Sequence, residues 1–231
     1  MKLSIGVMAL VAVLATPLVS AAQDAELSAN AGFVSQYYYR GAPQKTSSAS
    51  AGLDVAVNDF SAGTWAADVG DGAEIDLYAS YGVALTDEVS VSLGGTGYFY
   101  TGQFDDTYLE VNLGVGFRGI SIEYSVGQYR TGAPHPKYNF IGITGEHEGL
   151  FATVGTIAYA QDLSDALSDV FKRDAGSQYV EAGYGFTAAD LDFSISGIWN
   201  DSSLSGAVDG SAAPTHEVTL VFGLSKTFAL N

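Results

Sequence analysis

Apolar and polar residues alternate with a period of two along most of the chain that follows residue 22. From Ala73 to Leu85, every second residue is apolar or aromatic, and the residues between them are polar or small. A strand sends successive side chains to opposite faces, whereas a helix would scatter this pattern around its axis. The segment therefore predicts a β-strand with one apolar face.

Twelve segments of this kind are expected. The six with the clearest alternation are Ala73–Leu85, Glu88–Tyr100, Tyr108–Arg118, Ile120–Tyr129, Asp190–Asn200 and Glu217–Thr227. The six weaker ones are Leu27–Tyr39, Ser48–Val57, Ser61–Val69, Tyr138–Thr144, Leu150–Tyr159 and Ser177–Phe186. Many are longer than the ~5–6 residues usual for a strand of a globular protein, and they match the ~9–11 residues of a tilted membrane-spanning strand.

The connections between these segments differ in length in a regular way. Odd-numbered connections, such as Gly41–Thr46 and Ala160–Gly176, are mostly long, whereas even-numbered ones, such as Asn58-Asp59, are mostly tight turns. Outer-membrane barrels have short periplasmic turns and longer external loops. We therefore expect an all-β fold, a transmembrane antiparallel up-and-down β-barrel of about 12 strands, with both ends of the barrel sequence on the periplasmic side.

Aromatic residues fall near the ends of the expected strands. On the apolar faces, Phe117, Phe186 and Phe228 mark turn ends, and Tyr37, Tyr39, Phe99 and Trp199 mark loop ends. Such positions are typical of the aromatic girdles at membrane interfaces. The apolar core of a soluble β-sandwich would give a similar pattern, so the rhythm of loop lengths is the stronger argument for a barrel.

The N-terminal segment has the layout of a secretory signal peptide. Lys2 precedes an apolar stretch, and Ser20-Ala21-Ala22 supplies the small residues of a cleavage site. A membrane-anchoring helix is the alternative, but the early Pro17 favours cleavage. We expect residues 1–22 to be the signal peptide and residues 23–231 to form the outer-membrane barrel.

Composition narrows the classes of function. The 231 residues include 9 Lys and Arg against 26 Asp and Glu, a net charge of −17, which argues against a nucleic-acid partner because phosphate binding requires basic residues. The chain has no Cys, so it can form neither disulfides nor thiolate metal sites. Charged residues make up only 15% of the chain, less than the ~25% of an ordinary soluble domain.

The acidic residues are the main candidates for a functional site. Charged side chains rarely face lipid, so those within strands are expected to line the lumen. The candidate pore-lining residues are Arg40, Asp54, Asp68, Glu74, Asp76, Glu110, Glu123, Glu181, Asp192 and Glu217, with Arg118 as a second inward base. Two interpretations stay open: an acidic pore that prefers cations, and a hydrogen-bonded network that fills a narrow barrel, with Arg40 paired to a carboxylate.

Features that suggest other chemistry have simpler explanations. The spacing G-x-G-x-x-G at 114–119 lacks the helix that a dinucleotide site needs. His135, His147 and His216 show no pairing with a serine nucleophile, and the aspartates of loop 161–176 fit no calcium-binding loop. A short helix at 165–172 that caps the pore is an alternative for this loop. We expect no catalytic residue, no metal site and no cofactor, and hence not an enzyme.

Several short motifs resemble a known family. They are SANAGFVSQY at 28–37 with Arg40-Gly41, GTW at 63–65, EIDLY at 74–78 with Tyr81-Gly82, and YLEV at 108–111. Together they resemble the TorF family of porins, small proteobacterial outer-membrane proteins, and the resemblance covers most of the chain after residue 22. It implies a porin-like function.

The functional expectation follows from the fold and the acidic faces. We expect a porin-like barrel in the outer membrane of a Gram-negative bacterium, which allows passive diffusion of small solutes or ions and prefers cations. Its partners would be outer-membrane lipid, the diffusing solutes or cations, and the barrel-assembly machinery during insertion. The alternative is a non-conducting structural or adhesive barrel that acts through its external loops.

Overall fold

The computed structural model describes residues 25–130, 135, 137–160, 176–201 and 218–230. These residues form the strands β1 (Glu26–Tyr39), β2 (Ala42–Val57), β3 (Phe60–Gly70), β4 (Gly72–Ala84), β5 (Val89–Tyr100), β6 (Tyr108–Phe117), β7 (Ile120–Tyr129), β8 (Lys137–His147), β9 (Leu150–Ala160), β10 (Gly176–Ala188), β11 (Leu191–Asn200) and β12 (Val218–Ala229). Nowhere in these ranges is there a helix with the length and hydropathy that crossing a membrane requires.

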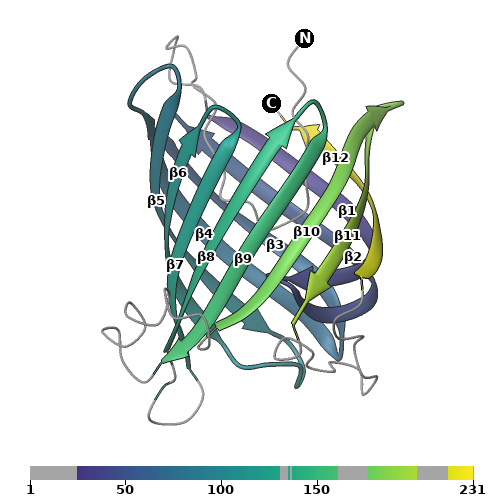
Figure 1. Cartoon of the computed structure of the whole chain (residues 1–231). Helices are drawn as coiled ribbons and strands as arrows, with labels where there is room; N and C mark the ends of the chain where they lie inside the picture. Colours follow the sequence, from purple (N-terminus) through teal and green to yellow (C-terminus); the bar gives the residue numbers. More distant parts are fainter. Residues whose placement is uncertain (1–24, 131–134, 136, 161–175, 202–217, 231) are drawn as a thin grey trace.

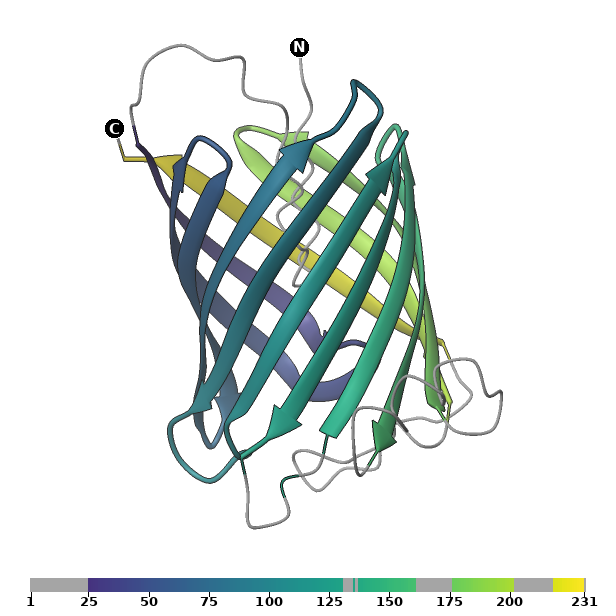
Figure 2. The same ribbon diagram turned by 90° about the vertical axis from the view of Figure 1, so that its left-hand side faces the viewer.

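Each strand pairs antiparallel with the next one in sequence, and β1 also pairs with β12. The sheet therefore closes into a barrel of twelve tilted strands, as Figures 1 and 2 show for the described residues. The expected fold class is confirmed. The expected signal peptide at residues 1–22 lies outside the described residues.

The wall of the barrel follows directly from the alternation in the sequence. On β6, Leu109, Val111, Leu113 and the other odd-numbered residues are exposed on the outside, whereas Glu110 is buried on the inside. The pairing of β6 with β5 places Leu93 beside Leu113, so outward apolar residues of neighbouring strands lie side by side. The exterior is thus apolar across neighbouring strands, and the polar residues face the lumen.

The two ends of the barrel differ. The start of β1, the end of β12 and a set of tight turns lie at one end, at the top of Figure 1. In the turn Arg118-Gly119 both residues have positive φ, 46° and 79°, and Glu148-Gly149 has φ of 48° and 88°. Such two-residue turns match the twist of antiparallel strands, and glycine adopts positive φ without the steric penalty of a side chain. The described β5–β6 connection lies at the opposite end, with the strand ends that border the other longer connections.

One connection at this loop end departs from the expected rhythm. The segment Gly41–Thr46 was expected to be a long loop, but β2 begins at Ala42, so that only Arg40 and Gly41 separate it from β1. The pairing of β1 with β2 continues to Tyr39 opposite Ala42, with a bulge between Tyr37 and Tyr38. An extended hairpin therefore takes the place of the expected loop.

Candidate functional site

The β1–β2 hairpin bends into the barrel at the loop end, as Figures 1 and 2 show. Its tip is the turn Arg40-Gly41, in which both residues have positive φ. The carbonyl oxygen of Gly41 accepts a hydrogen bond of 2.8 Å from the Asn200 side chain on β11. A Cβ added to Gly41 would lie only 2.3 Å from the Cβ of Tyr179 on β10. The backbone of the tip therefore rests directly against this part of the wall.

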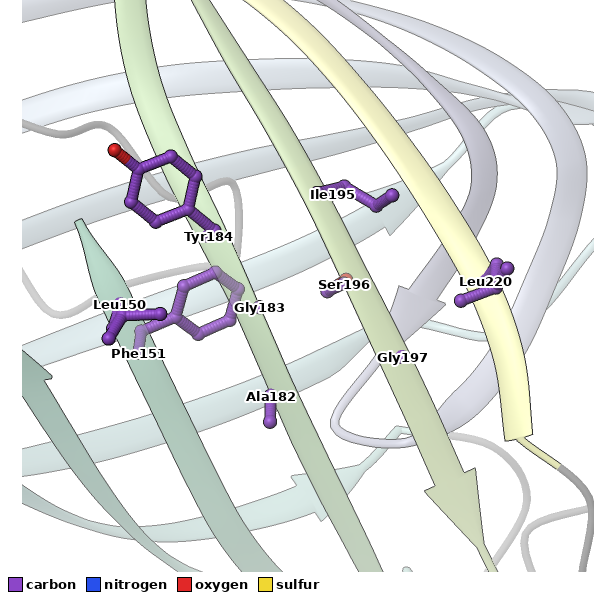
Figure 3. Close-up of a pocket in the computed structure, with 9 residues that line it drawn as sticks. All are labelled: Leu150, Phe151, Ala182, Gly183, Tyr184, Ile195, Ser196, Gly197 and Leu220. Atoms are coloured by element: carbon purple, nitrogen blue, oxygen red, sulfur yellow. The ribbon is translucent and has the colours of Figure 1, made fainter.

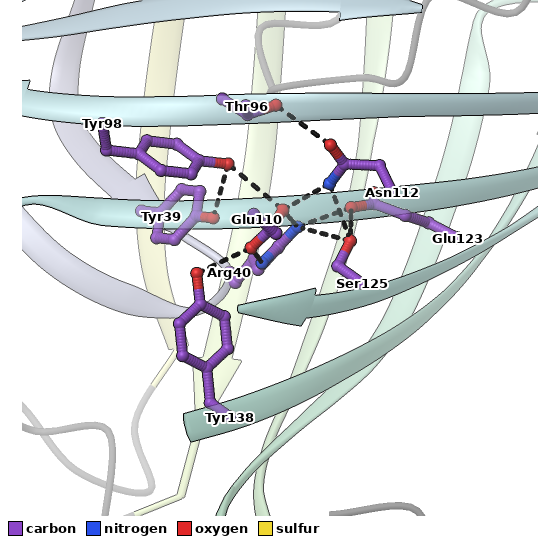
Figure 4. Close-up of polar contacts among 9 residues, drawn as sticks. All are labelled: Tyr39, Arg40, Thr96, Tyr98, Glu110, Asn112, Glu123, Ser125 and Tyr138. Carbon is purple, nitrogen blue, oxygen red and sulfur yellow. Dashed lines mark hydrogen bonds and ion pairs between the residues drawn. The ribbon is translucent and has the colours of Figure 1, made fainter. Parts of the chain in front are cut away.

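From the same tip, the Arg40 side chain reaches β6 and β7, which lie across the ring from β1 and β2. Figure 4 shows its contacts. Nη1 and Nη2 donate to the two carboxylate oxygens of Glu110 at 2.7 and 2.8 Å, and Nη2 also donates to Glu123 at 2.5 Å. The hairpin thus spans the lumen and is fixed to the far wall by a two-pronged ion pair, the geometry in which arginine binds carboxylate most strongly.

Glu110 is the centre of this network. Tyr138 donates to it at 2.8 Å, Tyr98 donates at 3.4 Å, and the Asn112 amide donates to it as well. The Glu110 side chain is fully buried and that of Arg40 is 7% exposed. A buried charge is tolerated only when it is paired and hydrogen-bonded, and here both conditions are met. One of the two interpretations of the sequence, a hydrogen-bonded network inside the barrel with Arg40 paired to a carboxylate, predicts this arrangement.

Tyrosine rings fill the space around the ion pair. The guanidinium carbon of Arg40 lies 4.0 Å from the centre of the Phe140 ring, within the range of a cation–π contact. Three edge-to-face ring pairs, with centroids 5.5 to 6.2 Å apart, join Tyr39 to Tyr98, Tyr98 to Tyr108, and Tyr108 to Tyr138. The loop half of the lumen is therefore packed with aromatic rings.

These rings depend on glycines of the neighbouring strands. The register places inward rings directly opposite inward glycines, in the pairs Tyr78 and Gly63, Tyr138 and Gly127, Tyr179 and Gly155, and Phe151 and Gly183. At each of these glycines an added Cβ would come within 2.1 to 2.7 Å of the paired ring. Each ring occupies the space that a side chain on the paired glycine would fill.

Gly127→Ala tests this packing. The new Cβ would overlap the ring of Tyr138 at 2.1 Å, displacing its hydroxyl from Glu110. We expect a loss of about 1–3 kcal/mol in the free energy of unfolding, from overpacking and a broken hydrogen bond. Gly145→Ala on β8 is the matched control, since its Cβ meets nothing within 4 Å. Urea unfolding in detergent measures both, and equal effects of the two substitutions would contradict the role of Gly127.

Other expected pore-lining carboxylates lie on the inward face nearer β2 and β4. Asp54 accepts hydrogen bonds from Asn30 at 3.1 Å and from Tyr78 at 2.5 Å. Glu74 is 2% exposed and accepts a hydrogen bond of 2.7 Å from Tyr37. Asp76 follows on the same face of β4. The structure therefore brings Glu74 and Asp76 near the hairpin and leaves Asp54 closer to the turn end.

Two further members of the predicted set lie elsewhere in the lumen. Glu181 of β10 lies beside Ser196 of β11. Asp192 accepts a hydrogen bond of 2.5 Å from Thr187, next to the turn that joins β10 to β11. Glu217 lies outside the described residues.

Asp68 and Arg118 were expected to face the lumen, but the structure places both of them away from it. Ala67 of β3 faces inward opposite Glu74, so Asp68 falls on the other side, half-exposed and paired with Lys45. A register shift between Asp68 and Gly70 accompanies this change. Arg118 lies in the turn between β6 and β7, 62% exposed, and pairs with Glu88. Neither residue belongs to the buried network.

The aromatic girdle also needs a correction. Phe99, Phe117, Phe186 and Phe228 are exposed on the outside of the barrel. Tyr37 and Tyr39 were expected there too, but their hydroxyls bond Glu74 and Tyr98 inside the lumen. The inward bend of the hairpin brings both rings into the lumen, and the bulge that follows Tyr37 changes the register ahead of Tyr39. The opposition of inward tyrosines to glycines on paired strands was the signal in the sequence that could have revealed the aromatic lumen.

The outer wall has a shallow depression of about 410 Å³ over β9 to β12, shown in Figure 3. Its rim includes Leu150, Tyr184 and Leu220, and the small residues Ala182 and Gly197 contribute to its lining. The lining is mostly apolar, includes Ser196, and contains no charged side chain. This depression belongs to the apolar exterior, so the chemistry of the barrel is concentrated in its lumen.

The histidines do not form a second site within the described part of the chain. His135 follows β7 and His147 ends β8, whereas His216 lies outside the described residues, as does most of the loop 161–176. The described residues hold no group of three or more histidine, aspartate or glutamate side chains positioned to bind a metal ion.

Comparisons with solved structures bear on the fold. A chain from a study of the in-meso crystallization of membrane proteins superposes with a TM-score of 0.52 at 12% identity, over 89% of this chain and 84% of that chain. OprD, an outer-membrane protein from Pseudomonas aeruginosa, gives a TM-score of 0.42 at 13% identity, over 89% of this chain and 65% of its own length. OccAB3 from Acinetobacter baumannii gives 0.40 at 10% identity, over 80% of this chain and 56% of its own length.

Sequence comparison gives the family. No curated protein matches the chain significantly. Residues 19–228 match the model of Gcw_chp, a bacterial protein of unknown function, and this match extends over nearly the whole barrel. The chain therefore belongs to the Gcw_chp family of bacterial proteins of unknown function.

Proposed function

We propose that the protein is a porin-like barrel of the bacterial outer membrane that admits small solutes or ions and prefers cations. The observation that carries the proposal is the distribution of charge between a polar lumen and an apolar exterior. Asp76, Glu74 and Glu110 are buried within the barrel, and their outward neighbours such as Leu77 and Leu109 are exposed. Soluble proteins rarely expose apolar surface around a whole barrel, and lipid would cover it.

The acidic excess supports the preference for cations. Arg40 offsets the charge of Glu110 and Glu123, and it leaves Asp54, Glu74 and Asp76 without a basic partner among the described residues. Carboxylates that line a narrow passage attract cations and repel anions. The resemblance of the sequence to TorF-type porins supports the same proposal, as does the layout of residues 1–22 as a signal for export.

Planar-bilayer recording tests the proposal. The protein is purified in detergent, its folded state is checked by heat-modifiable migration on a gel, and currents are recorded under a gradient of KCl. We expect discrete conductance steps and a reversal potential displaced toward that of K⁺. A reversal potential on the chloride side would contradict cation preference, and a folded barrel without any conductance would contradict the pore.

The inward hairpin favours a second candidate. Its tip contacts β6 and β7 on one side and β10 and β11 on the other, so it obstructs the passage at the loop end. A barrel that stays closed would act as a structural or adhesive protein through its external loops. It would give no solute flux in a liposome-swelling assay, and deletion of external loops would be the change that affects the cell.

A further inference from the structure

Asp76 differs from the other carboxylates of the lumen. Its side chain has no solvent exposure, and neither of its carboxylate oxygens has a hydrogen-bond partner among the described residues. An ionised carboxylate in such a place is strongly destabilising unless a positive charge or hydrogen-bond donors offset it. The barrel therefore holds a carboxylate for which the described part of the chain supplies no hydrogen-bond partner.

Three tyrosine hydroxyls near Asp76 donate to other acceptors. Tyr98 lies directly opposite Asp76 on β5, but its hydroxyl donates to Glu110. The Tyr37 hydroxyl donates to Glu74, and the Tyr78 hydroxyl, two residues along β4, donates to Asp54. The arrangement satisfies each neighbouring carboxylate and leaves both oxygens of Asp76 available for a ligand.

The electrostatic surroundings favour a cation as that ligand. Glu74 and Glu110 are close enough to act electrostatically on Asp76. The guanidinium of Arg40 is directed at Glu110 and Glu123, so these two carboxylates already share its single positive charge. Glu74 and Glu110 thus add negative potential at Asp76 without forming a common metal-binding cluster with it, and a cation beside Asp76 would lower the repulsion among the three charges.

The strand register adds aromatic neighbours. Trp65 of β3 and Tyr98 of β5 are paired with Asp76 on its two sides, which places their side chains on the same inward face. Residues paired across neighbouring strands have Cβ atoms about 5 Å apart. Aromatic faces attract cations that have lost part of their hydration, so both neighbours suit a partly dehydrated ion.

We propose that Asp76 binds a monovalent metal cation such as K⁺ or Na⁺ in the lumen, with Glu74 and Glu110 supplying longer-range attraction. This site deepens the cation-preferring pore proposed above and rests on it for its role, as the place where a permeating ion pauses. One directly coordinating carboxylate suits a monovalent ion. The described residues offer no cluster of three carboxylate or imidazole side chains for a divalent ion, and Mg²⁺ loses its hydration reluctantly.

A stability measurement tests the site without requiring conductance. The thermal midpoint of the folded barrel in detergent is measured by its gel mobility, in KCl and in the chloride of the bulky cation N-methyl-D-glucamine at equal ionic strength. A ligand that binds only the folded state raises the midpoint. We expect K⁺ to raise it by about 3 °C in the wild-type protein, the shift that a ligand present well above its dissociation constant gives to a chain of this size.

Asp76→Asn and Asp76→Ala are expected to lose this K⁺-dependent shift. Asp54→Asn is the matched control, because Asp54 also faces the lumen but has Asn30 and Tyr78 as partners, and it is expected to keep the shift. A shift that persists in both Asp76 variants would overturn the site. Equal midpoints in the two salts for the wild-type protein would also overturn it, because they would indicate a protonated Asp76. In a third measurement in MgCl₂, stabilisation by Mg²⁺ but not by K⁺ would overturn it as well.

Bilayer recordings separate this inference from the proposed function. If the wild-type barrel shows the K⁺-dependent shift but no conductance, the cation site stands and the pore fails. If the barrel conducts with a cation preference that Asp76→Asn leaves unchanged, and the midpoint is independent of K⁺, the pore stands and the site fails. We expect the substitution to reduce both the K⁺-dependent shift and the preference for K⁺ over Cl⁻.

Discussion

Arg40→Met is expected to destabilise the barrel by about 3–5 kcal/mol, the usual effect of removing one partner of a buried ion pair. Methionine retains much of the length and apolar volume of the side chain, so it keeps contact with the Phe140 ring but leaves Glu110 and Glu123 without a cation. The hydrogen bond from Tyr138 to Glu110 would remain. Urea unfolding in detergent micelles, followed by tryptophan fluorescence, measures the change.

Arg118→Met is the matched control. Arg118 also pairs with a glutamate, Glu88, but the two side chains are 62% and 47% exposed. Exposed ion pairs contribute about 0–1 kcal/mol, so this substitution should have little effect. Adding Glu110→Gln to Arg40→Met should recover part of the lost stability, because it removes one of the two stranded charges. Equal effects of Arg40→Met and Arg118→Met would contradict the importance of the buried pair.

The barrel itself could be predicted because its physics is local. Alternation with a period of two places Leu109, Val111 and Leu113 on one face and Glu110 on the other, whatever the remainder of the chain does. Once the outer face is apolar on neighbouring strands and the inner face polar, closure of the sheet leaves no unpaired edge. The inward positions of Asp54, Glu74 and Asp76 follow from the same rule.

The hairpin could not be predicted, because its direction depends on contacts distant in sequence. Tyr37 and Tyr39 have the parity of outward residues, and the inward bend of a hairpin whose Arg40 binds Glu110, 70 residues later, brings them inside. Asp68 is a different case. Its expected inward position is wrong because Trp65 and Ala67 occupy the inward positions of β3, so the alternation itself sends Asp68 to the other side before the register shifts. Periodicity predicts the regular middle of a strand but not its irregular end.

The acidic lumen and the hairpin have opposite consequences for the transport proposed above. Carboxylates such as Glu74 and Asp76 attract cations, but the tip occupies the passage that these ions would use. Release of Arg40 from Glu110 would be required for the tip to leave the far wall, and a buried bidentate pair opposes such movement. The conductance of the barrel therefore depends on whether solutes pass beside the tip.

Shortening the hairpin is expected to raise the conductance several-fold. Gln36 and Thr46 are directly paired, so an Asn-Gly turn in place of residues 37–45 closes β1 onto β2 at that point. The tip that crosses the lumen is then absent, and a wider passage carries more current. Glu110→Gln is included in the variant, because removal of Arg40 otherwise leaves that carboxylate buried and unpaired. Single-channel recording in KCl measures the change.

A deletion within the β5–β6 loop, residues 102–106, is the control, since it shortens an external connection and leaves the hairpin in place. The deletion is made together with Glu110→Gln, and it should leave the conductance close to that of the full-length barrel that carries Glu110→Gln alone. If the shortened hairpin conducts no better, the tip does not limit the current and solutes pass beside it. If current is seen only after shortening, the native barrel is closed by Arg40 and its contacts, and passive diffusion is not its function.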